Sequence, residues 1–320
     1  MIRKLTNKLI ILGLMAMAGA GYAQPERREY VDYVDPLIES AKSRYFYFNS
    51  ACRPFGMVNL SPDNILEKEW NSGYKYQEPY IRGLTHIHDW GVGGLLLMPT
   101  VGQIDPTKGP EGWKSLFSHE NEQAQAGYHQ VYFEDYQTNV ELTSTTRVGF
   151  HRYTFDQSGE ARIMVYLGGQ LGGGIMKDAF LKRVSSTELE GWVVQESFVG
   201  DVTLFFVIQF DKPFDELTAW KDKRLEGRVA DSVAGRQLGV FATYHISEGY
   251  QLKVKAGVSW CNIGQARLNL DTELDHWDFD RIRRESRDEW NQWLGRIDVK
   301  GGTEQQKIKF YKDVWRSLLG

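Results

Sequence analysis

A long succession of short strand patterns, with no helical pattern between them, constrains the fold of this chain most. Residues 128–155 are rich in β-branched and aromatic side chains that alternate with polar ones, which is typical of strands. Further strand patterns, each bounded by Gly, Asp, Ser or Pro, occupy residues 162–167, 189–198, 202–210, 238–246 and 250–260. Because strands without crossover helices pair antiparallel, the sequence predicts a mainly β chain built on a large antiparallel sandwich.

Two segments of this region are predicted to be loops. Residues 167–174, LGGQLGGG, are rich in glycine but lack the Gly-Lys-Ser/Thr ending of a phosphate-binding loop, and no helical pattern follows them. This segment is therefore expected to be a turn between strands. The charged residues 221–228, KDKRLEGR, are expected to form a solvated loop.

The pattern changes from strands to helices near Asp271. Between residues 278 and 294, apolar side chains recur three and four positions apart, which predicts a helix with one apolar stripe. Thr303 and Gln306 form the T-x-x-Q pattern of a capping box at the start of a second helix. The apolar stripe of that helix consists of Ile308, Tyr311, Val314, Trp315 and Leu318. No later segment follows to cover this stripe, so we expect it to be uncovered and the chain to be the front part of a longer protein.

Residues 1–23 have the pattern of a secretory signal peptide. Basic residues precede an apolar run at residues 9–20, and the small residues Gly21 and Ala23 suit cleavage before Gln24. The run is too short to span a bilayer comfortably. We therefore expect a mature protein in the periplasm or outside a bacterial cell, with no membrane attachment after cleavage.

Size and charge restrict the class of partner. A chain of 320 residues that is 42% hydrophobic can form one large domain or two ordinary ones. The net charge is only -4, so neither nucleic acid nor an anionic membrane is expected as a partner. Cys52 and Cys261 could pair in an oxidising compartment, but two buried free thiols are the slightly preferred interpretation.

Residues 70–102 hold the densest mixture of aromatic and polar side chains in the sequence. A pyranose has apolar C–H faces that lie on flat rings and hydroxyl groups that need donors and acceptors at its edge, so such a mixture suits a sugar site. The candidate substrate-binding residues are Trp70, His86, His88, Asp89 and Trp90.

The His86–His88 pair leaves more than one interpretation open. If residues 84–88 are extended, the period of two places both imidazoles on one face of a strand. Two imidazoles can bind a metal, but no third ligand stands at a telling spacing and Asp89 is a weak candidate, so we predict no metal site here. The histidines can instead be held by hydrogen bonds within the fold, or they can contact a polar ligand directly. Trp70 and Trp90 also have two possible roles, packing within the fold or stacking on a sugar.

A resemblance to a known family adds to these observations. Eight motifs carry it in order along the chain: YVDPLI (33–38), CRPFGMVNLSPD (52–63), WNSGYKY (70–76), IRGLTHIH (81–88), LLLMPTVG (95–102), AGYHQV (126–131), VELTSTTRVGFHRYTF (140–155) and FDKPF (210–214). With these motifs, and with the two helical segments that follow, the sequence resembles glycoside hydrolase family 92, the bacterial exo-acting α-mannosidases.

The resemblance implies a domain plan. Residues 24–270 would form a β-supersandwich, residues 271–302 a helical linker, and residues 303–320 the first helix of a truncated (α/α)6 catalytic barrel. It also implies calcium-dependent hydrolysis of α-mannose-containing glycans with inversion. Inversion needs an acid and a base carboxyl group roughly 6.5–9.5 Å apart. The family carries both in the barrel, beyond Gly320, and most of the calcium site as well, so we expect no catalytic residue in this chain and no activity from it alone.

Two rival functions stay open beside the mannosidase. One is a stand-alone carbohydrate-binding or scaffold module, and the other is a glycoside phosphorylase with a similar sandwich-plus-barrel plan. The chain also departs from the family where residues 89–94 read DWGVGG, since many members have a Ser-Gly-Thr-Gly-like run there. This departure leaves the linkage preference open.

Overall fold

The computed structural model describes residues 28–41, 48–66, 73–88, 93–169, 175–197 and 200–319. Within these ranges the eight-stranded sheet has the order β1 (Ala51–Cys52), β2 (Asn59–Asp63), β4 (Gly83–Thr85), β5 (Leu96–Val101), β11 (Gly159–Tyr166), β18 (Gly239–Ile246), β15 (Glu216–Lys221) and β16 (Arg224–Arg228). The nine-stranded sheet has the order β17 (Ser232–Ala234), β12 (Ile175–Arg183), β13 (Glu188–Ser197), β14 (Gly200–Phe210), β19 (Tyr250–Ser259), β10 (Val148–Phe155), β9 (Thr138–Ser144), β8 (Tyr128–Phe133) and β7 (Glu122–Gln125). A separate pair joins β3 (Tyr80–Ile81) and β6 (Ser115–Leu116).

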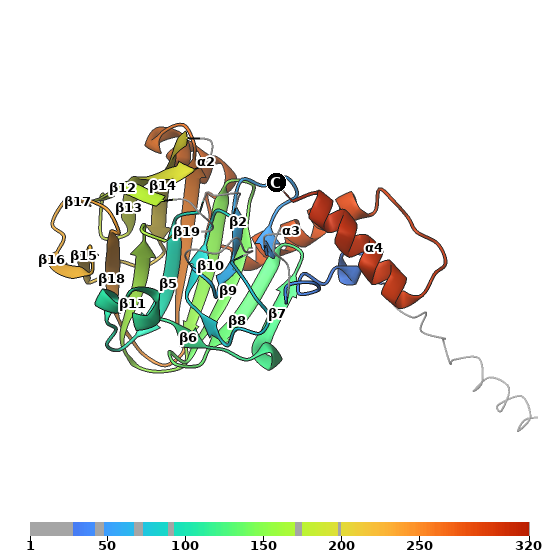
Figure 1. Cartoon of the computed structure of the whole chain (residues 1–320), viewed down its shortest axis with the longest axis horizontal. Coiled ribbons are helices and arrows are strands. Elements are labelled where there is room, and N and C mark those ends of the chain that lie inside the picture. The colour runs from blue at the N-terminus through green and yellow to red at the C-terminus, as the bar shows by residue number, and fades with distance from the viewer. Residues whose placement is uncertain are drawn as a thin grey trace, which may run out of the picture.

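Three α-helices and three 3-10 helices complete the described elements. The α-helices are α2 (Ile263–Glu273), α3 (Phe279–Leu294) and α4 (Glu304–Ser317), and the 3-10 helices are η1 (Tyr30–Tyr33), η2 (Pro106–Gly112) and η3 (His119–Asn121). In Figure 1 the strands form one body, and α3 and α4 lie at one end of it. No helix in the described ranges is long and apolar enough to cross a membrane.

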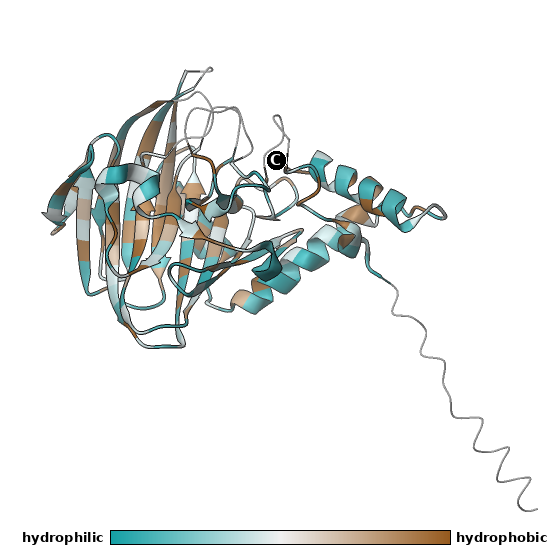
Figure 2. Cartoon of the chain, turned by 60° about the horizontal axis from the view of Figure 1, so that its bottom comes forward, coloured by the Kyte–Doolittle hydropathy of each residue, from teal (hydrophilic) through white to brown (hydrophobic). Residues whose placement is uncertain are grey.

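The sandwich core lies between the two large sheets, and β10 shows how the sequence builds it. Tyr153 and Phe155 belong to the core cluster that contains strands of both sheets. Val148 and Phe150 instead belong to a cluster with Leu270 of α2. Since successive side chains of a strand point to opposite faces, β10 serves two apolar surfaces at once. Figure 2 shows hydrophobic strands within the sandwich beside largely hydrophilic helix ribbons. The predicted mainly β antiparallel sandwich is confirmed.

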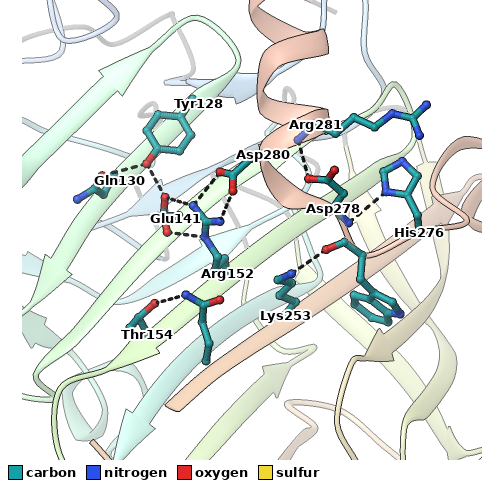
Figure 3. A network of polar contacts seen from close by, with 12 residues as sticks. Tyr128, Gln130, Glu141, Arg152, Thr154, Lys253, His276, Asp278, Asp280 and Arg281 are labelled. Atoms are coloured by element: carbon teal, nitrogen blue, oxygen red, sulfur yellow. Dashed lines mark hydrogen bonds and ion pairs between the residues drawn. The ribbon is translucent and has the colours of Figure 1, made fainter. Parts of the chain in front are cut away.

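An ion-pair network fixes the start of α3 to the nine-stranded sheet (Figure 3). Arg152 of β10 donates to both oxygens of Glu141, at 2.6 and 2.7 Å, and to both oxygens of Asp280 in α3, at 3.0 and 3.1 Å. The hydrogen bonds from Arg152 lower the pKa of Asp280. Asp278 caps the helix, because its side chain accepts from the Arg281 amide at 3.0 Å. The predicted helix at residues 278–294 is confirmed.

The second predicted helix is also confirmed, but its apolar stripe is covered. Thr303 and Gln306 form the predicted capping box of α4. Tyr311 and Trp315 are buried in a cluster with Val31 of η1, so the expectation of an uncovered stripe was wrong for these two residues. The segment that covers them comes from the other end of the chain, which the helical pattern alone could not reveal.

Several further expectations differ from the structure. Residues 221–228 form the turn and outer strand of the β15–β16 hairpin rather than a loop, although β16 is exposed throughout. The first described helix after the sandwich, α2, begins at Ile263, whereas helices were expected only from residue 271. Cys52 and Cys261 are both free, but only Cys52 is buried. The signal-peptide pattern at residues 1–23 and part of the glycine-rich turn, residues 170–174, lie outside the described residues.

Candidate functional site

Two of the five predicted substrate-binding residues lie within the described part of the chain. His86 and His88 directly follow β4. Trp70 lies in residues 67–72, which we call the Trp70 segment, and Asp89 and Trp90 lie in residues 89–92, which we call the Trp90 segment. Both segments fall outside the described residues. The predicted strand at residues 84–88 ends at Thr85, and the histidines make separate sets of contacts.

His86 belongs to a buried chain of hydrogen bonds that joins the two sheets. Its Nδ1 lies 2.7 Å from the Leu95 carbonyl oxygen, and its Nε2 lies 2.9 Å from Nε2 of His151 on β10. His151 Nδ1 lies 2.9 Å from the Tyr153 hydroxyl. The two sheets approach closely here because Gly149 has no side chain: an added Cβ would clash with the His86 ring.

The protonation states of the two histidines decide which atom donates in each of these hydrogen bonds. Burial lowers the pKa of His86 to about 4 and the pKa of His151 well below its usual value, so both rings are neutral near pH 7. A neutral imidazole has one donor and one acceptor nitrogen. Because the Leu95 carbonyl can only accept, Nδ1 of His86 donates to it, His151 donates to His86, and Tyr153 donates to His151. Each ring is thereby held in one tautomer.

His88 lies between two acceptors. Its Nδ1 is 2.6 Å from the Asn59 carbonyl oxygen, and its Nε2 is 2.7 Å from Oδ1 of Asp63. Two short contacts to acceptors require either both ring protons or a proton on the Asp63 carboxyl. Asp63 is fully buried, and its Oδ2 has no partner among the described residues. Gly73, at φ +78°, leaves room for this pair, since an added Cβ would clash with Asp63 Oδ1.

The described residues that flank the Trp70 and Trp90 segments make buried contacts, two of them at this pair. Gly73 follows the Trp70 segment, and an added Cβ there would lie 3.2 Å from the ring of His88. His88 precedes the Trp90 segment. Gly93 follows it, and its amide donates to Oε1 of the buried Gln195 at 2.9 Å, while the Gln195 side-chain amide donates back to the Gly93 carbonyl. Gly73 and His88 therefore meet at the Asp63–His88 pair, while Gly93 is fixed separately by Gln195.

A second buried polar cluster surrounds the hydroxyl of Tyr74, the residue after Gly73. The Tyr74 hydroxyl lies 2.9 Å from both carboxylate oxygens of Glu122. His119 Nδ1 and His129 Nε2 lie 2.6 and 3.1 Å from the same carboxylate. Burial raises the pKa of Glu122, but the contacts with His129, His119 and Tyr74 outweigh burial, so its pKa lies below the usual value. An ionised carboxylate thus anchors Tyr74, next to Gly73.

The sequence did not identify the partners of the predicted histidines. Asp63 lies 25 positions before His88, His151 lies 65 positions after His86, and Glu122 lies 48 positions after Tyr74. Periodicity locates strands but does not show which strands become neighbours. Of these partners, only Asp63 had a signal in the sequence, because it ends the CRPFGMVNLSPD motif.

The described residues offer no metal site of their own. Within them, no group of three or more His, Cys, Asp and Glu side chains could hold a metal ion. The carboxylates nearest the histidines are engaged with imidazole and phenol groups instead. They do not form the set of several free oxygen ligands that calcium prefers.

The family models cover nearly all of the chain after residue 32. The model of the glycosyl hydrolase family 92 N-terminal domain matches residues 33–259, and the model of the family 92 catalytic domain matches residues 265–320. The two matches meet near the start of α2. A secreted glycosidase of Arthroderma benhamiae, itself described as uncharacterized, is 23% identical over 350 residues, which cover 97% of this chain and 44% of that protein.

Solved structures give the same relationship. A family GH92 α-mannosidase of Bacteroides thetaiotaomicron matches with a TM-score of 0.84 and 25% identity over 92% of this chain and 42% of that protein. Its complex with mannoimidazole matches with a TM-score of 0.84 and 24% identity over 91% of this chain and 40% of that protein. An inverting family GH92 mannosidase of the same species matches with a TM-score of 0.80 and 22% identity over 92% of this chain and 40% of that protein. This chain thus spans less than half the length of these relatives. With 227 of its 320 residues, 33–259, matched by the N-terminal domain model, the chain belongs to glycosyl hydrolase family 92.

Proposed function

We propose that this chain is the sandwich part, with the first helices, of a secreted α-mannosidase that hydrolyses α-mannose-containing glycans with inversion and depends on calcium. In this proposal the sandwich supplies sugar-binding surface to a catalytic barrel. The observation that carries it is the contact between Gly73, which follows the Trp70 segment, and the Asp63–His88 pair, whose His88 precedes the Trp90 segment. Tryptophan rings near this contact would suit a sugar, because a pyranose binds by stacking on rings and by hydrogen bonds at its edge.

The five predicted residues take two kinds of role in this proposal. Trp70 and Trp90 would stack on sugar rings, and Asp89 would accept hydrogen bonds from sugar hydroxyls. The direct sugar contacts expected of His86 and His88 stay a prediction. Their ring nitrogens contact protein atoms, which supports a role in holding the Trp90 segment in position.

The reaction itself would use groups outside the described residues. Inverting hydrolysis needs an acid carboxyl to protonate the leaving oxygen and a base carboxylate to activate water, roughly 6.5–9.5 Å apart. We propose that the barrel supplies both groups and most of the calcium ligands. Secretion is supported by the signal-peptide pattern at residues 1–23 and by the relative of Arthroderma benhamiae, which is described as a secreted glycosidase.

Turnover by a longer protein that continues from this chain through a complete barrel tests the function. We expect hydrolysis of an α-linked mannobiose, loss of activity after calcium chelation, and recovery when calcium is added back. Proton NMR of the first turnovers should show β-mannose, the product of inversion. Turnover that requires inorganic phosphate would identify a phosphorylase instead, and binding without turnover would identify a carbohydrate-binding module.

Substitutions in that longer protein test the site. Trp70→Ala should remove a stacking surface, and His86→Ala or His88→Ala should remove hydrogen bonds of about 0.5–1.5 kcal/mol each, so kcat/KM should fall at least several-fold. Tm is measured on the same samples. A lowered Tm with unchanged kcat/KM for all three variants would return these residues to the core and exclude them from the site.

A further inference from the structure

A cleft of about 620 Å³ opens at the end of the sandwich that lies away from α3 and α4. The tip of the β15–β16 hairpin, η2 and the end of β11 line it. In Figure 1 this hairpin is at the left end of the molecule, while α3 and α4 are toward the right. The volume falls within the range of roughly 300–1,000 Å³ that is typical of small-molecule sites. The cleft is therefore large enough for a ligand. Two of its lining residues connect it with the region described above, since Leu66 directly precedes the Trp70 segment and the Arg82 amide donates to the Asp63 carbonyl at 2.7 Å.

The cleft carries an excess of positive charge. Its charged lining residues are Arg82, Lys108, Lys223, Arg236, Glu111 and Asp222. Arg82 pairs with Glu111, which accepts from its Nε at 2.9 Å, and Lys108 pairs with Asp105 at 3.4 Å. Among the described residues, neither Lys223 nor Arg236 has a carboxylate partner within ion-pair distance. Four cationic and two acidic side chains thus meet in one concavity of a chain whose net charge is -4. Such a concavity attracts anions, because its walls concentrate the field of the lining charges.

Packed aromatic rings form a rigid floor beneath these charges. Tyr166 and Trp220 stack at 6.0 Å between ring centroids, and Trp113 meets the Tyr166 ring edge-on at 5.2 Å. All three side chains are buried, and the Trp113 indole N–H donates to the Arg82 carbonyl at 2.9 Å. A fixed floor keeps the cleft from collapsing, so the opening is preformed.

The rim of the cleft is held in an unfavourable backbone conformation. Asp222, Lys223 and Gln237 have φ of 48°, 63° and 46°, in the left-handed region. A two-residue hairpin turn of this kind is usually Asn-Gly, so Asp-Lys is a strained choice at positions 222 and 223. Non-glycine residues in such conformations are concentrated at ligand-binding and active sites. Asp222, Lys223 and Gln237 are all among the residues that line the cleft.

We propose that this cleft binds an anionic saccharide, one that carries a phosphate or carboxylate group. Lys223 and Arg236 bind the anionic group, while Glu111 and Gln237 accept or donate hydrogen bonds at the sugar hydroxyls. The excess of positive charge selects the anion, and the polar groups beside it select a hydroxylated ligand rather than an apolar one. The inference rests on the charged lining of the cleft and does not rest on the mannosidase function proposed above.

Isothermal titration calorimetry of the 320-residue chain in phosphate-free buffer tests this inference. The probes are mannose 6-phosphate, glucuronic acid, mannose and inorganic phosphate. We expect saturable binding of the two anionic sugars and none of mannose. In the double variant Lys223→Asn, Arg236→Gln the affinity should fall at least about tenfold. Asn is at ease in the left-handed conformation of position 223, so this variant should fold, and its Tm and circular dichroism verify that.

The matched control is Arg284→Gln, Lys300→Asn, which removes two exposed charges outside the cleft. Its affinity for the anionic sugars should equal that of the unchanged chain. Equal loss of binding in both double variants would reduce the effect to overall charge and overturn the inference. Equal affinity for inorganic phosphate and mannose 6-phosphate would overturn the assignment to a saccharide, and absence of saturable binding by either anionic sugar would overturn the site.

Discussion

At the scale of single residues, the polar interior between the sheets is unusual because most of its titratable groups bond to one another. The His86–His151–Tyr153 chain and the Asp63–His88 pair lie within one region and are fully buried. Buried polar groups cost free energy unless they are paired, and paired groups fix one geometry. The flanks of the Trp70 and Trp90 segments inherit that rigidity.

The neutral histidines predict a loss of stability in mild acid. In the folded chain the pKa of His86 is about 4, and the pKa of His151 is also lowered, whereas both should titrate near 6.5 when unfolded. The unfolded state therefore binds more protons below pH 6.5. Stability is fully present above that pH and is lost as pH falls toward 4, by up to about 1.4 kcal/mol per pH unit for each histidine.

Urea unfolding between pH 7.5 and 5 measures this slope, because most carboxyl groups titrate below that window. The variant His151→Gln should reduce the slope by about one proton. Gln305→Ala, an exposed change that removes no titratable group, is the control and should leave the slope unchanged. An unaltered slope in His151→Gln would contradict the prediction.

Gly73 provides a second prediction at this scale. Gly73→Ala should destabilise the chain by at least about 2 kcal/mol more than Gly301→Ala. Both residues have positive φ, +78° and +81°, so both variants bear a similar backbone penalty. Only at Gly73 would the added Cβ clash with Asp63, while at Gly301 it would meet nothing within 4 Å. Equal free energies of unfolding for the two variants would contradict the prediction, because they would show that the Asp63–His88 pair can shift without loss of stability.

At the scale of elements, the sequence predicts structure well where the determinants are local. The caps of α3 and α4 lie within a few residues of the apolar stripes that they begin, so both helices could be located. By contrast, α2 has buried Asn269 beside Ala266 and Leu270 and lacks a clear apolar stripe. The outer strand β16 is exposed at every position, so alternation could not reveal it. In both cases tertiary contacts decide the structure.

The capping box of α4 gives a prediction at this scale. Thr303→Ala should cost about 1 kcal/mol, because the Gln306 amide loses its side-chain acceptor at the first turn. Hydrogen exchange should accelerate in α4 and not in α2. Gln305→Ala, an exposed change in the same turn, is the control. Equal exchange rates in the two variants would mean that packing on η1 alone holds the helix start.

At the scale of the whole molecule, this chain has its own apolar cores, yet we expect it to lack catalytic activity. The described part has a continuous core between its sheets and two smaller apolar clusters at its helices. We predict that the 320-residue chain hydrolyses no α-mannoside measurably, since both inverting carboxyl groups are expected in the barrel. Release of 4-nitrophenol from 4-nitrophenyl α-mannoside is the measurement. Turnover that disappears when a carboxylate of residues 24–320 is changed would refute this.

The joining of the first and last elements determines the order in which the molecule can assemble. Arg287 of α3 pairs with Asp32 at 2.7 Å across 255 positions, and Lys312 of α4 pairs with Glu39 at 2.7 Å across 273 positions. Trp290 donates to the Cys52 carbonyl across 238 positions. Contacts of such sequence separation slow folding, because a long loop must close before they form. Asp32, Glu39 and Cys52 can therefore make these contacts only after α3 and α4 have formed. We expect this step to be among the last in folding.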